Sequence, residues 1–315
     1  MKPQVVVVGS FVQDLTWQCA EFPRAGETVI GRFATGPGGK GSNQAVAAGR
    51  AGAATLFIGA VGRDVFADAA RKFYAAEGIA ACFVEKPAHA TATAAILVNA
   101  SAQNEIVVAL GASAHLEPGE VDPALIQGAK VVICQHEASL AINAHVFQLA
   151  RAAGATTVLN PAPMRPDFDA GILRLVDVLI PNETEFVALL NRPGTGAPLT
   201  ESALPGLPPE QLHRLCRTLG VRTVIVTLGP RGCFVSEPER YTAIPAHTGL
   251  KVADTTGAGD AFVGGFAAGV VQSGGDAVAA ARHGNAVAAL SVTKFGTAPS
   301  MPTKAEIERF MRTRG

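Results

Sequence analysis

Residues 254–260, which read DTTGAGD, combine the residue types that a phosphoryl-transfer site needs. An apolar stretch at 261–271 follows, so the run indicates a tight turn that opens onto a helix. Glycines let the backbone turn sharply and point N–H groups at one place, where the helix dipole favours an anion. Asp260, beside such a hole, could accept the proton of a hydroxyl that attacks a phosphoryl group. An Asp that only caps the helix is the alternative that this run leaves open.

A second glycine-rich run, GPGGKGSNQ at 36–44, leads into another helical stretch. It is not a P-loop, because Ala34 and Gly41 stand where that motif requires Gly and Ser or Thr. The glycines would let a ligand lie against the backbone, and Lys40 and Asn43 offer donors that suit sugar hydroxyls. A turn that merely caps a helix explains the run as well.

Two further runs follow strand-like segments. Asn182 and Glu185 stand three apart at a helix start, so both can face a cleft at the strand end. A carboxylate there would repel a nucleoside triphosphate unless Mg²⁺ or its ordered waters intervened, which makes Glu185 a candidate for holding the hydration shell of the metal. A capping box explains the same spacing. The TLGPRG run at 227–232 suits nucleotide phosphates or ribose, although it is weak by itself.

The elements that position these runs alternate between strand and helix. Strand-like segments cover 4–8, 55–61, 130–134, 156–159, 176–180 and 223–227, and helical stretches cover 42–51, 64–76, 140–152, 183–190, 258–272, 276–292 and 304–312. This order predicts a three-layer α/β/α fold with a central, mostly parallel sheet. Ligands then bind beyond the carboxyl ends of the strands.

Two regions break the alternation and read as extended chain, at 12–35 and at 91–110 around a polar turn. We expect four strands from about 12–37 and 90–112 to form a small β-sheet lid over the binding edge, within a single domain of residues 1–315. A lid would exclude water during phosphoryl transfer. Strands that only extend the central sheet are the alternative.

Composition excludes several classes of protein. The 315 residues are 48% hydrophobic, and 26 basic residues balance 26 acidic ones, which argues against a nucleic-acid or membrane-surface partner. The five scattered cysteines, without a C-x-x-C pair, indicate neither a disulfide framework nor a zinc site. Neither a signal peptide nor a membrane span is apparent, so we expect a soluble, cytoplasmic protein.

Taken in chain order, the four runs resemble the PfkB, or ribokinase, family of carbohydrate kinases. The agreement extends over nearly the whole chain: GSFVQD at 9–14, GET at 26–28, GGKGSNQA at 38–45 and NPAP at 160–163 are most similar to the ribokinase branch. The resemblance implies an ATP-dependent kinase that phosphorylates the terminal hydroxymethyl group of a pentose, with D-ribose converted to ribose 5-phosphate as the favoured reaction.

The resemblance also implies roles for individual residues. Asp260 would be the general base, and the amides of Gly257, Ala258 and Gly259 would form the anion hole. The sugar contacts implied are Asp14, Gly38, Gly39, Lys40, Asn43, Glu137 and Asp260. The nucleotide contacts implied are Asn182, Thr227, Gly229, Gly232, Gly259 and Asn285. Glu185 would serve Mg²⁺ through water, and a potassium site would involve Asp254, Thr256, Ser291, Lys294, Gly296 and Ser300, mostly through backbone oxygens. A homodimer formed through the lid is implied as well.

One departure from the family pattern bears on the substrate. Many bacterial ribokinases have Asn two residues before the sugar-binding Asp, whereas this chain has Val12, whose side chain cannot donate to a hydroxyl. Ribose remains favoured, and a kinase for another sugar, for a sugar acid such as 2-keto-3-deoxygluconate or for a nucleoside remains open. Lys40 and Glu137 suit a small polyol and argue against the nucleoside.

Two rival functions fit less well. A dehydrogenase is suggested by VVVVG at 5–9, but Ser10, Phe11 and Val12 follow in place of the second and third glycines of the dinucleotide fingerprint. A sugar sensor derived from an inactive kinase would have lost the base or the anion-hole glycines, yet Asp260, Gly257 and Gly259 are all present.

Overall fold

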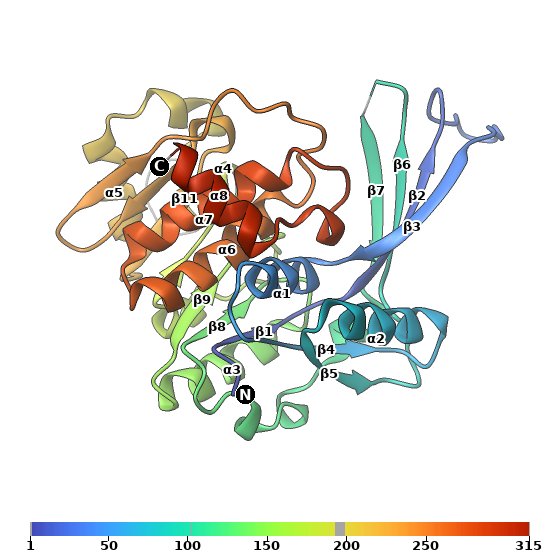
Figure 1. Cartoon of the computed structure of the whole chain (residues 1–315), viewed down its shortest axis with the longest axis horizontal. Helices are drawn as coiled ribbons and strands as arrows, with labels where there is room; N and C mark the ends of the chain where they lie inside the picture. The colour runs from blue at the N-terminus through green and yellow to red at the C-terminus, as the bar shows by residue number, and fades with distance from the viewer. Residues whose placement is uncertain (1, 102, 193–198, 315) are drawn as a thin grey trace.

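The computed structural model describes residues 2–101, 103–192 and 199–314 (Figure 1). Its main body is built on a nine-stranded sheet in the order β13-β12-β11-β10-β9-β8-β1-β4-β5. These strands are β1 (Val5–Val8), β4 (Thr55–Val61), β5 (Ala80–Glu85), β8 (Val131–Cys134), β9 (Thr156–Leu159), β10 (Val178–Leu179), β11 (Thr223–Thr227), β12 (Cys233–Ser236) and β13 (Tyr241–Ile244). Pairing is parallel from β5 to β11, and β12 and β13 add an antiparallel edge. The expected mostly parallel sheet is confirmed.

Helices cover both faces of this sheet because its strands are apolar on both sides. In β1, Val5 and Val7 pack into one hydrophobic core and Val6 and Val8 into the other, as the two-residue period of a strand requires. The first core includes residues of α1 (Lys40–Arg50), α2 (Val65–Glu77), α6 (Ala258–Ser273), α7 (Ala277–Ser291) and α8 (Lys304–Arg314). The second includes residues of α3 (Leu140–Ala152), α4 (Glu183–Leu190) and α5 (Pro209–Thr218). The three-layer arrangement is therefore as expected.

A second, four-stranded sheet stands apart from the main body (Figure 1). Its order is β3-β2-β6-β7, formed by β2 (Val12–Gln18), β3 (Arg32–Gly38), β6 (Thr93–Val98) and β7 (Asn104–Ala109). The outer pairs are antiparallel, and β2 and β6 pair in parallel. The separate small sheet is confirmed, although β2 ends at Gln18 and β3 begins only at Arg32, so strands cover only part of the extended chain expected at 12–35. We refer to this sheet as the lid.

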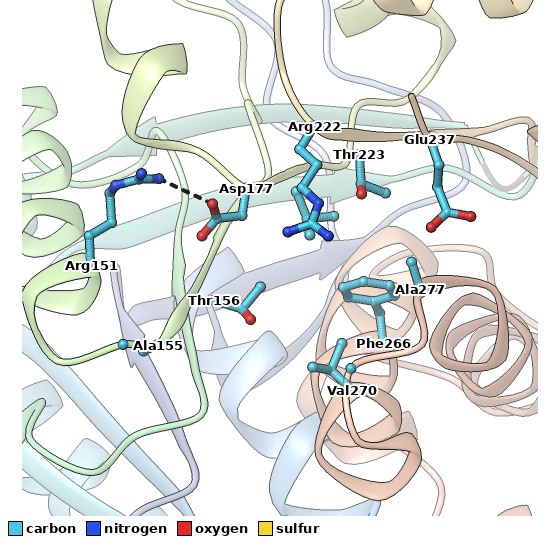
Figure 2. A pocket seen from close by; sticks show the side chains of 13 residues that line it. Arg151, Ala155, Thr156, Asp177, Arg222, Thr223, Glu237, Phe266, Val270 and Ala277 are labelled. Carbon is cyan, nitrogen blue, oxygen red and sulfur yellow. Dashed lines mark hydrogen bonds and ion pairs between the residues drawn. The ribbon is translucent and has the colours of Figure 1, made fainter. Parts of the chain in front are cut away.

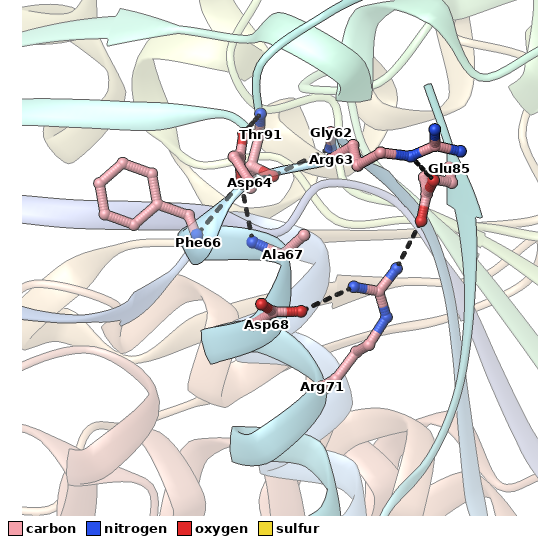
Figure 3. Close-up of polar contacts among 9 residues, drawn as sticks. All are labelled: Gly62, Arg63, Asp64, Phe66, Ala67, Asp68, Arg71, Glu85 and Thr91. Carbon is pink, nitrogen blue, oxygen red and sulfur yellow. Dashed lines mark hydrogen bonds and ion pairs between the residues drawn. The ribbon is translucent and has the colours of Figure 1, made fainter. Parts of the chain in front are cut away.

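The base of the lid is attached to the main body through Asp64 (Figure 3). Its Oδ1 accepts from the amides of Phe66 and Ala67 at the start of α2, and its Oδ2 accepts from the amide of Thr91, just before β6, at 2.7 Å. The Thr91 hydroxyl donates to Oδ1 at 2.7 Å. Burial opposes the charge, but these bonds outweigh it and lower the pKa of Asp64.

Four elements carried little signal in the sequence. The edge strand β5 is only partly buried, and the hairpin β12–β13 consists of two four-residue strands, so neither shows a clear alternation. Helix α5 begins at Pro209, inside the Pro- and Gly-rich segment 192–210, of which 193–198 lie outside the described residues. Among the described residues, no helix is long and apolar enough to cross a bilayer.

Candidate functional site

Beyond the carboxyl ends of the central strands, the side chain of Asp260 lies against two side-chain amides from consecutive residues of α1. The Nδ2 of Asn43 donates to Oδ2 of Asp260 at 2.9 Å, and the Nε2 of Gln44 donates to Oδ1 at 2.9 Å. All three side chains are buried. The two glycine-rich runs therefore meet here, although they are more than 200 residues apart in the chain.

Glycines make this approach possible because α1 and α6 cross with almost no side chain between them. A Cβ on Gly264, one turn after Asp260 on α6, would lie 2.4 Å from the carbonyl oxygen of Gln44. A Cβ on Gly41 would lie 2.8 Å from the Cα of Gly9, at the end of β1. Contacts under 3.0 Å force neighbouring atoms apart, so larger residues would move α1 relative to both elements.

Glu137, which follows β8, lies at the start of α1. Its Oε2 accepts from the Ser10 hydroxyl at 2.7 Å and from the amide of Lys40 at 2.8 Å. The carboxylate thus satisfies one of the free amides of the helix and lies where the helix dipole favours a negative charge. Among the described residues, its other oxygen, Oε1, has no hydrogen-bond partner and can accept from a ligand hydroxyl.

Asp14 on β2 adds a second carboxylate next to the glycines of the same run. Burial, reinforced by Glu137 and Asp260 and opposed by the Thr297 hydroxyl, raises the pKa of Asp14 from 3.8 to about 7. A Cβ on Gly38 would lie 2.3 Å from the carboxylate of Asp14, so only glycine leaves room for it. Gly39 adopts φ 90° beneath Val12, a conformation that favours glycine.

Lys40 supplies the positive charge in this acidic surrounding. Burial acts to lower the pKa of Lys40, but Asp260, Glu137 and Glu185 outweigh it and raise the value. The ammonium group therefore stays charged and partly balances three carboxylates that come from three different elements. A ligand with several hydroxyl groups would find donors and acceptors side by side here.

The start of α6 presents open amides next to Asp260. Gly257 has φ 77°, and a Cβ on Gly259 would meet nothing within 4 Å. The amide of Ala258 donates to the carbonyl of Thr255 at 3.2 Å and is engaged within the turn. Among the described residues, the backbone amides of Gly257 and Gly259 have no hydrogen-bond partner, so these two remain available to an anion.

Asn182 and Glu185 form a complete capping box at the start of α4. Oδ1 of Asn182 accepts from the amide of Glu185 at 2.8 Å, and Oε2 of Glu185 accepts from the amide of Asn182 at 2.9 Å. Burial raises the pKa of Glu185, while the Asn182 amide and Lys40 lower it and Asp260 raises it further. Because both oxygens of Glu185 already accept hydrogen bonds from Asn182, an outer-sphere role through water fits this carboxylate better than direct metal ligation.

The remaining nucleotide candidates line neighbouring strand ends. The amide of Thr227 at the end of β11 donates to the carbonyl of Pro181 at 2.9 Å, next to Asn182. The Nδ2 of Asn285 on α7 donates to the carbonyl of Pro245 at 2.8 Å. Gly229 and Gly232 both have positive φ, and a Cβ on Gly232 would lie 2.0 Å from the carbonyl of Ile244, so a structural role accounts for Gly232.

The six potassium candidates come from two loops that Asp254 joins. Its Oδ1 accepts from the amide of Thr256 at 2.9 Å and its Oδ2 from that of Gly296 at 3.1 Å. Ser291 and Ser300 donate their hydroxyls to backbone carbonyls, and Lys294 directs its ammonium group to Glu306 on α8. Because Lys294 is paired with Glu306, its ammonium group does not occupy the carboxylate and carbonyl oxygens of these segments, a donor set that fits a hard cation. Among the described residues, no three His, Cys, Asp or Glu side chains converge on a metal site.

Gln44, Asn160 and Thr297 belong to this site but were not identified from the sequence as contributors. Gln44 lies in the run at 36–44 and Asn160 in the run at 160–163. The amide side chain in each run is the signal that could have indicated a hydrogen-bonding role in the site. Thr297 donates to the carbonyl of Pro37 at 3.2 Å and to Asp14 at 3.5 Å, a contact between segments 283 residues apart that no local pattern indicates.

A cavity of about 390 Å³ lies at the opposite edge of the sheet (Figure 2). Arg151, Asp177 and Arg222 line it at the amino ends of β9 to β11, and Arg151 pairs with Asp177 at 3.1 Å. Ligands of open α/β sheets bind at the carboxyl ends, where the acidic residues and the open amides lie, so we place the site there.

Comparison with known proteins identifies the family of this chain. The family model described as "pfkB family carbohydrate kinase" matches residues 2–304. The chain is 33% identical to the deoxyribokinase of Salmonella typhi (98% of each chain) and 35% identical to the ribokinase of Haemophilus influenzae (99% of each). It also superposes on the Arabidopsis thaliana ribokinase complexed with ribose and ATP with a TM-score of 0.84, at 28% identity over 99% of each chain. The chain therefore belongs to the PfkB family of carbohydrate kinases, as its motifs had suggested.

Proposed function

We propose that this protein transfers the γ-phosphoryl group of ATP to the terminal hydroxymethyl group of a pentose, with D-ribose converted to ribose 5-phosphate. The observation that carries the proposal is the position of Asp260, which two amides of α1 hold beside the open amides at the start of α6. The ribokinase of Haemophilus influenzae and the ribose and ATP complex of the Arabidopsis thaliana enzyme support it.

On the sugar side, Asp14, Glu137 and Lys40 would bind hydroxyl groups, and Gly38 and Gly39 would let the sugar lie against the backbone. The Oδ1 of Asn43 is buried next to Asp260 without a hydrogen-bond partner in the described part of the chain, and would accept from the sugar. An orphaned buried acceptor is costly in the free protein, which favours a ligand that donates to it.

Asp260 would take the proton of the attacking hydroxymethyl group. Phosphoryl transfer has a loose transition state, so alignment of the hydroxyl and stabilisation of charge contribute more than strong base catalysis. The amides of Gly257 and Gly259 would receive the charge that develops on the transferred group. The lid would close over the sugar and exclude water, which limits hydrolysis of ATP.

On the nucleotide side, Asn182, Thr227, Gly229 and Asn285 would bind ATP along the ends of β10 and β11 and the start of α7. Mg²⁺, when bound to the phosphates, neutralises their charge, and Glu185 would hold water in its hydration shell. The loops joined by Asp254 would bind K⁺ and so hold the start of α6 in place, because Asp254 lies six residues before Asp260.

Deoxyribose is the second candidate substrate. The deoxyribokinase of Salmonella typhi is about as similar to this chain as the ribokinases are. Val12 is 2% exposed, and its side chain lies against Gly39. An apolar group here provides no hydrogen bond for a sugar hydroxyl. A sugar that lacks this hydroxyl would therefore lose less binding free energy than at a site whose side chain donates to it. Another sugar, a sugar acid or a nucleoside ranks below these two.

We also propose that the lid forms a homodimer contact with a second copy of the chain. The lid exposes Ile106 and Val108 on one face and Ile30 just before β3, whereas Trp17, Phe33 and Val107 share the other face, which is the proposed contact surface. Trp17 and Phe33 pack at 5.2 Å between ring centroids, so this surface is ordered by its own contacts. Exposed apolar side chains gathered on one sheet are typical of an interface.

The test compares Asp260→Asn with Asp276→Asn, a matched control at the N-cap of the neighbouring helix α7. ATP consumption is measured with ribose, deoxyribose, fructose, 2-keto-3-deoxygluconate, adenosine and cytidine. We expect ribose or deoxyribose to be the best substrate and Asp260→Asn to lower kcat by about two to four orders of magnitude, with near-normal activity in the control. Near-normal turnover in Asp260→Asn would overturn the assignment of the base.

A further inference from the structure

A chain of buried amides continues from Asp260 into the body of the protein. The Nε2 of Gln44, besides its bond to Asp260, donates to Oδ1 of Asn160 at 3.0 Å. The Oε1 of Gln44 accepts from the Nε2 of Gln135 at 2.6 Å. Gln44 and Gln135 are fully buried and Asn160 is 8% exposed, so water cannot replace these partners.

A backbone carbonyl determines how the Asn160 amide is oriented, and the Asn160 amide in turn determines how Gln44 is oriented. The Nδ2 of Asn160 donates to the carbonyl of Ile180 at 2.9 Å, so its Oδ1 must face Gln44. Gln44 must then present its NH₂ group to Asn160, and the second proton of that group points at Asp260. A flipped Gln44 amide would place its oxygen against two other oxygens, so the network excludes it.

We infer that Gln44 is a positioning residue for the phosphoryl-transfer reaction: its side-chain amide holds the Asp260 carboxylate in one orientation. Asn43 and Gln44 bind one carboxylate oxygen each from consecutive positions of α1. The carboxylate therefore cannot rotate, and its remaining lone pairs have one direction in which to accept the hydroxyl proton. This inference rests on the proposed role of Asp260 as the base.

The network also joins the two halves of the site. Gln135 lies two residues before Glu137 on the sugar side, and Ile180 lies two residues before Asn182 on the nucleotide side. Gln44 is bonded toward both, through Gln135 and through Asn160. The base is thereby aligned by the same segments that would bind the two substrates, which is what a transfer reaction requires.

The test uses Gln44→Met, which keeps the length of the side chain and removes both donors, and Gln44→Glu, which places a second carboxyl group against Asp260. Asn143→Leu is the control, because it also removes a buried amide donor, the 2.7 Å bond to the carbonyl of Gln135, without touching Asp260. We expect Gln44→Met to lower kcat about 10- to 100-fold. Its dissociation constant for ribose, measured by calorimetry without ATP, should change by less than about 3-fold.

The pH profile of kcat distinguishes positioning from general damage. Besides Gln44, the charged groups that act with Asp260 are Asp14 on β2, Lys40 on α1 and Glu185 on α4, and all of them are unchanged in the variants. Loss of a donor to an ionised carboxylate disfavours its charge, and an adjacent carboxyl group disfavours it more. The acidic limb should therefore move to higher pH in Gln44→Met and further in Gln44→Glu, with no movement in Asn143→Leu.

A double-mutant cycle with Asp260→Asn separates this inference from the proposed function. If Gln44 acts through Asp260, Gln44→Met should lower kcat little further in the Asp260→Asn background. An equal loss in both backgrounds, or an unmoved acidic limb, would overturn the role of Gln44 while Asp260 keeps its own. If Asp260→Asn alone has little effect, the proposed function fails instead. Should Gln44→Met not fold, Gln44→Glu and its pH profile decide the question.

Discussion

Replacing Asp14 with Asn should stabilise the ligand-free protein at alkaline pH while it weakens sugar binding. The pKa of this carboxyl is raised from 3.8 to about 7 by burial and by Glu137 and Asp260, so the folded protein binds a proton that the unfolded chain has lost. The ionised form therefore destabilises the fold. This free-energy penalty is absent below about pH 4, grows between about pH 4 and about pH 7, and is constant at higher pH.

The magnitude follows from the shift of about three pKa units, each worth about 1.4 kcal/mol, for a limit near 4 kcal/mol. Between pH 5 and pH 8 the penalty grows by about 2–3 kcal/mol. For a chain of 315 residues this corresponds to a Tm difference of roughly 4 °C. The Tm of Asp14→Asn minus that of the wild type should therefore be larger at pH 8 than at pH 5 by about this amount.

Thermal unfolding of both proteins without sugar, at pH 5 and pH 8, measures the effect. Calorimetry with ribose then measures binding, which we expect to weaken about 10- to 100-fold, because a hydrogen bond to a charged group is lost. A gain in Tm that is equal at both pH values would reflect packing alone and would refute the electrostatic reasoning, as would a loss of stability at pH 8.

Three further predictions follow from contacts around the site. Asp64→Asn should destabilise the protein by about 1–2 kcal/mol at pH 8. The loss of stability should shrink as the pH falls through the lowered pKa of Asp64, a pH dependence opposite in sign to that of Asp14→Asn. Unfolding measured as a function of pH checks both variants. Gly264→Ala should cost about 1–3 kcal/mol and lower kcat, since its Cβ would meet the Gln44 carbonyl at 2.4 Å, whereas Gly206→Ala, which meets nothing within 4 Å, should do neither. Replacing K⁺ with Na⁺ or Li⁺ should lower kcat, and equal rates in the three salts would contradict the potassium site.

The motifs located most of the candidate site because they are local. Asp260, Lys40 and Asn43 lie in short glycine-rich runs whose chemistry is evident from a few adjacent residues, and the structure brings these three together. Glu137 is different: no local pattern assigns it, and the family resemblance alone indicated a role. Its bonds to Ser10 and Lys40 now give a physical reason for its place.

The periodicity of apolar residues by itself determined the layers of this protein. A strand such as VVVV at 5–8 must be buried on both faces, and alternating strands and helices must form a covered parallel sheet. What periodicity cannot encode is which side chains meet at the strand ends. The raised pKa of Asp14, the Thr297 contact and the amides of Gln44, Gln135 and Asn160 all depend on burial and on partners from distant segments. These contacts depend on how closely α1 and α6 pack, which only the tertiary structure decides. Glycines allow the close packing, but their local sequence predicts nothing more than a flexible backbone.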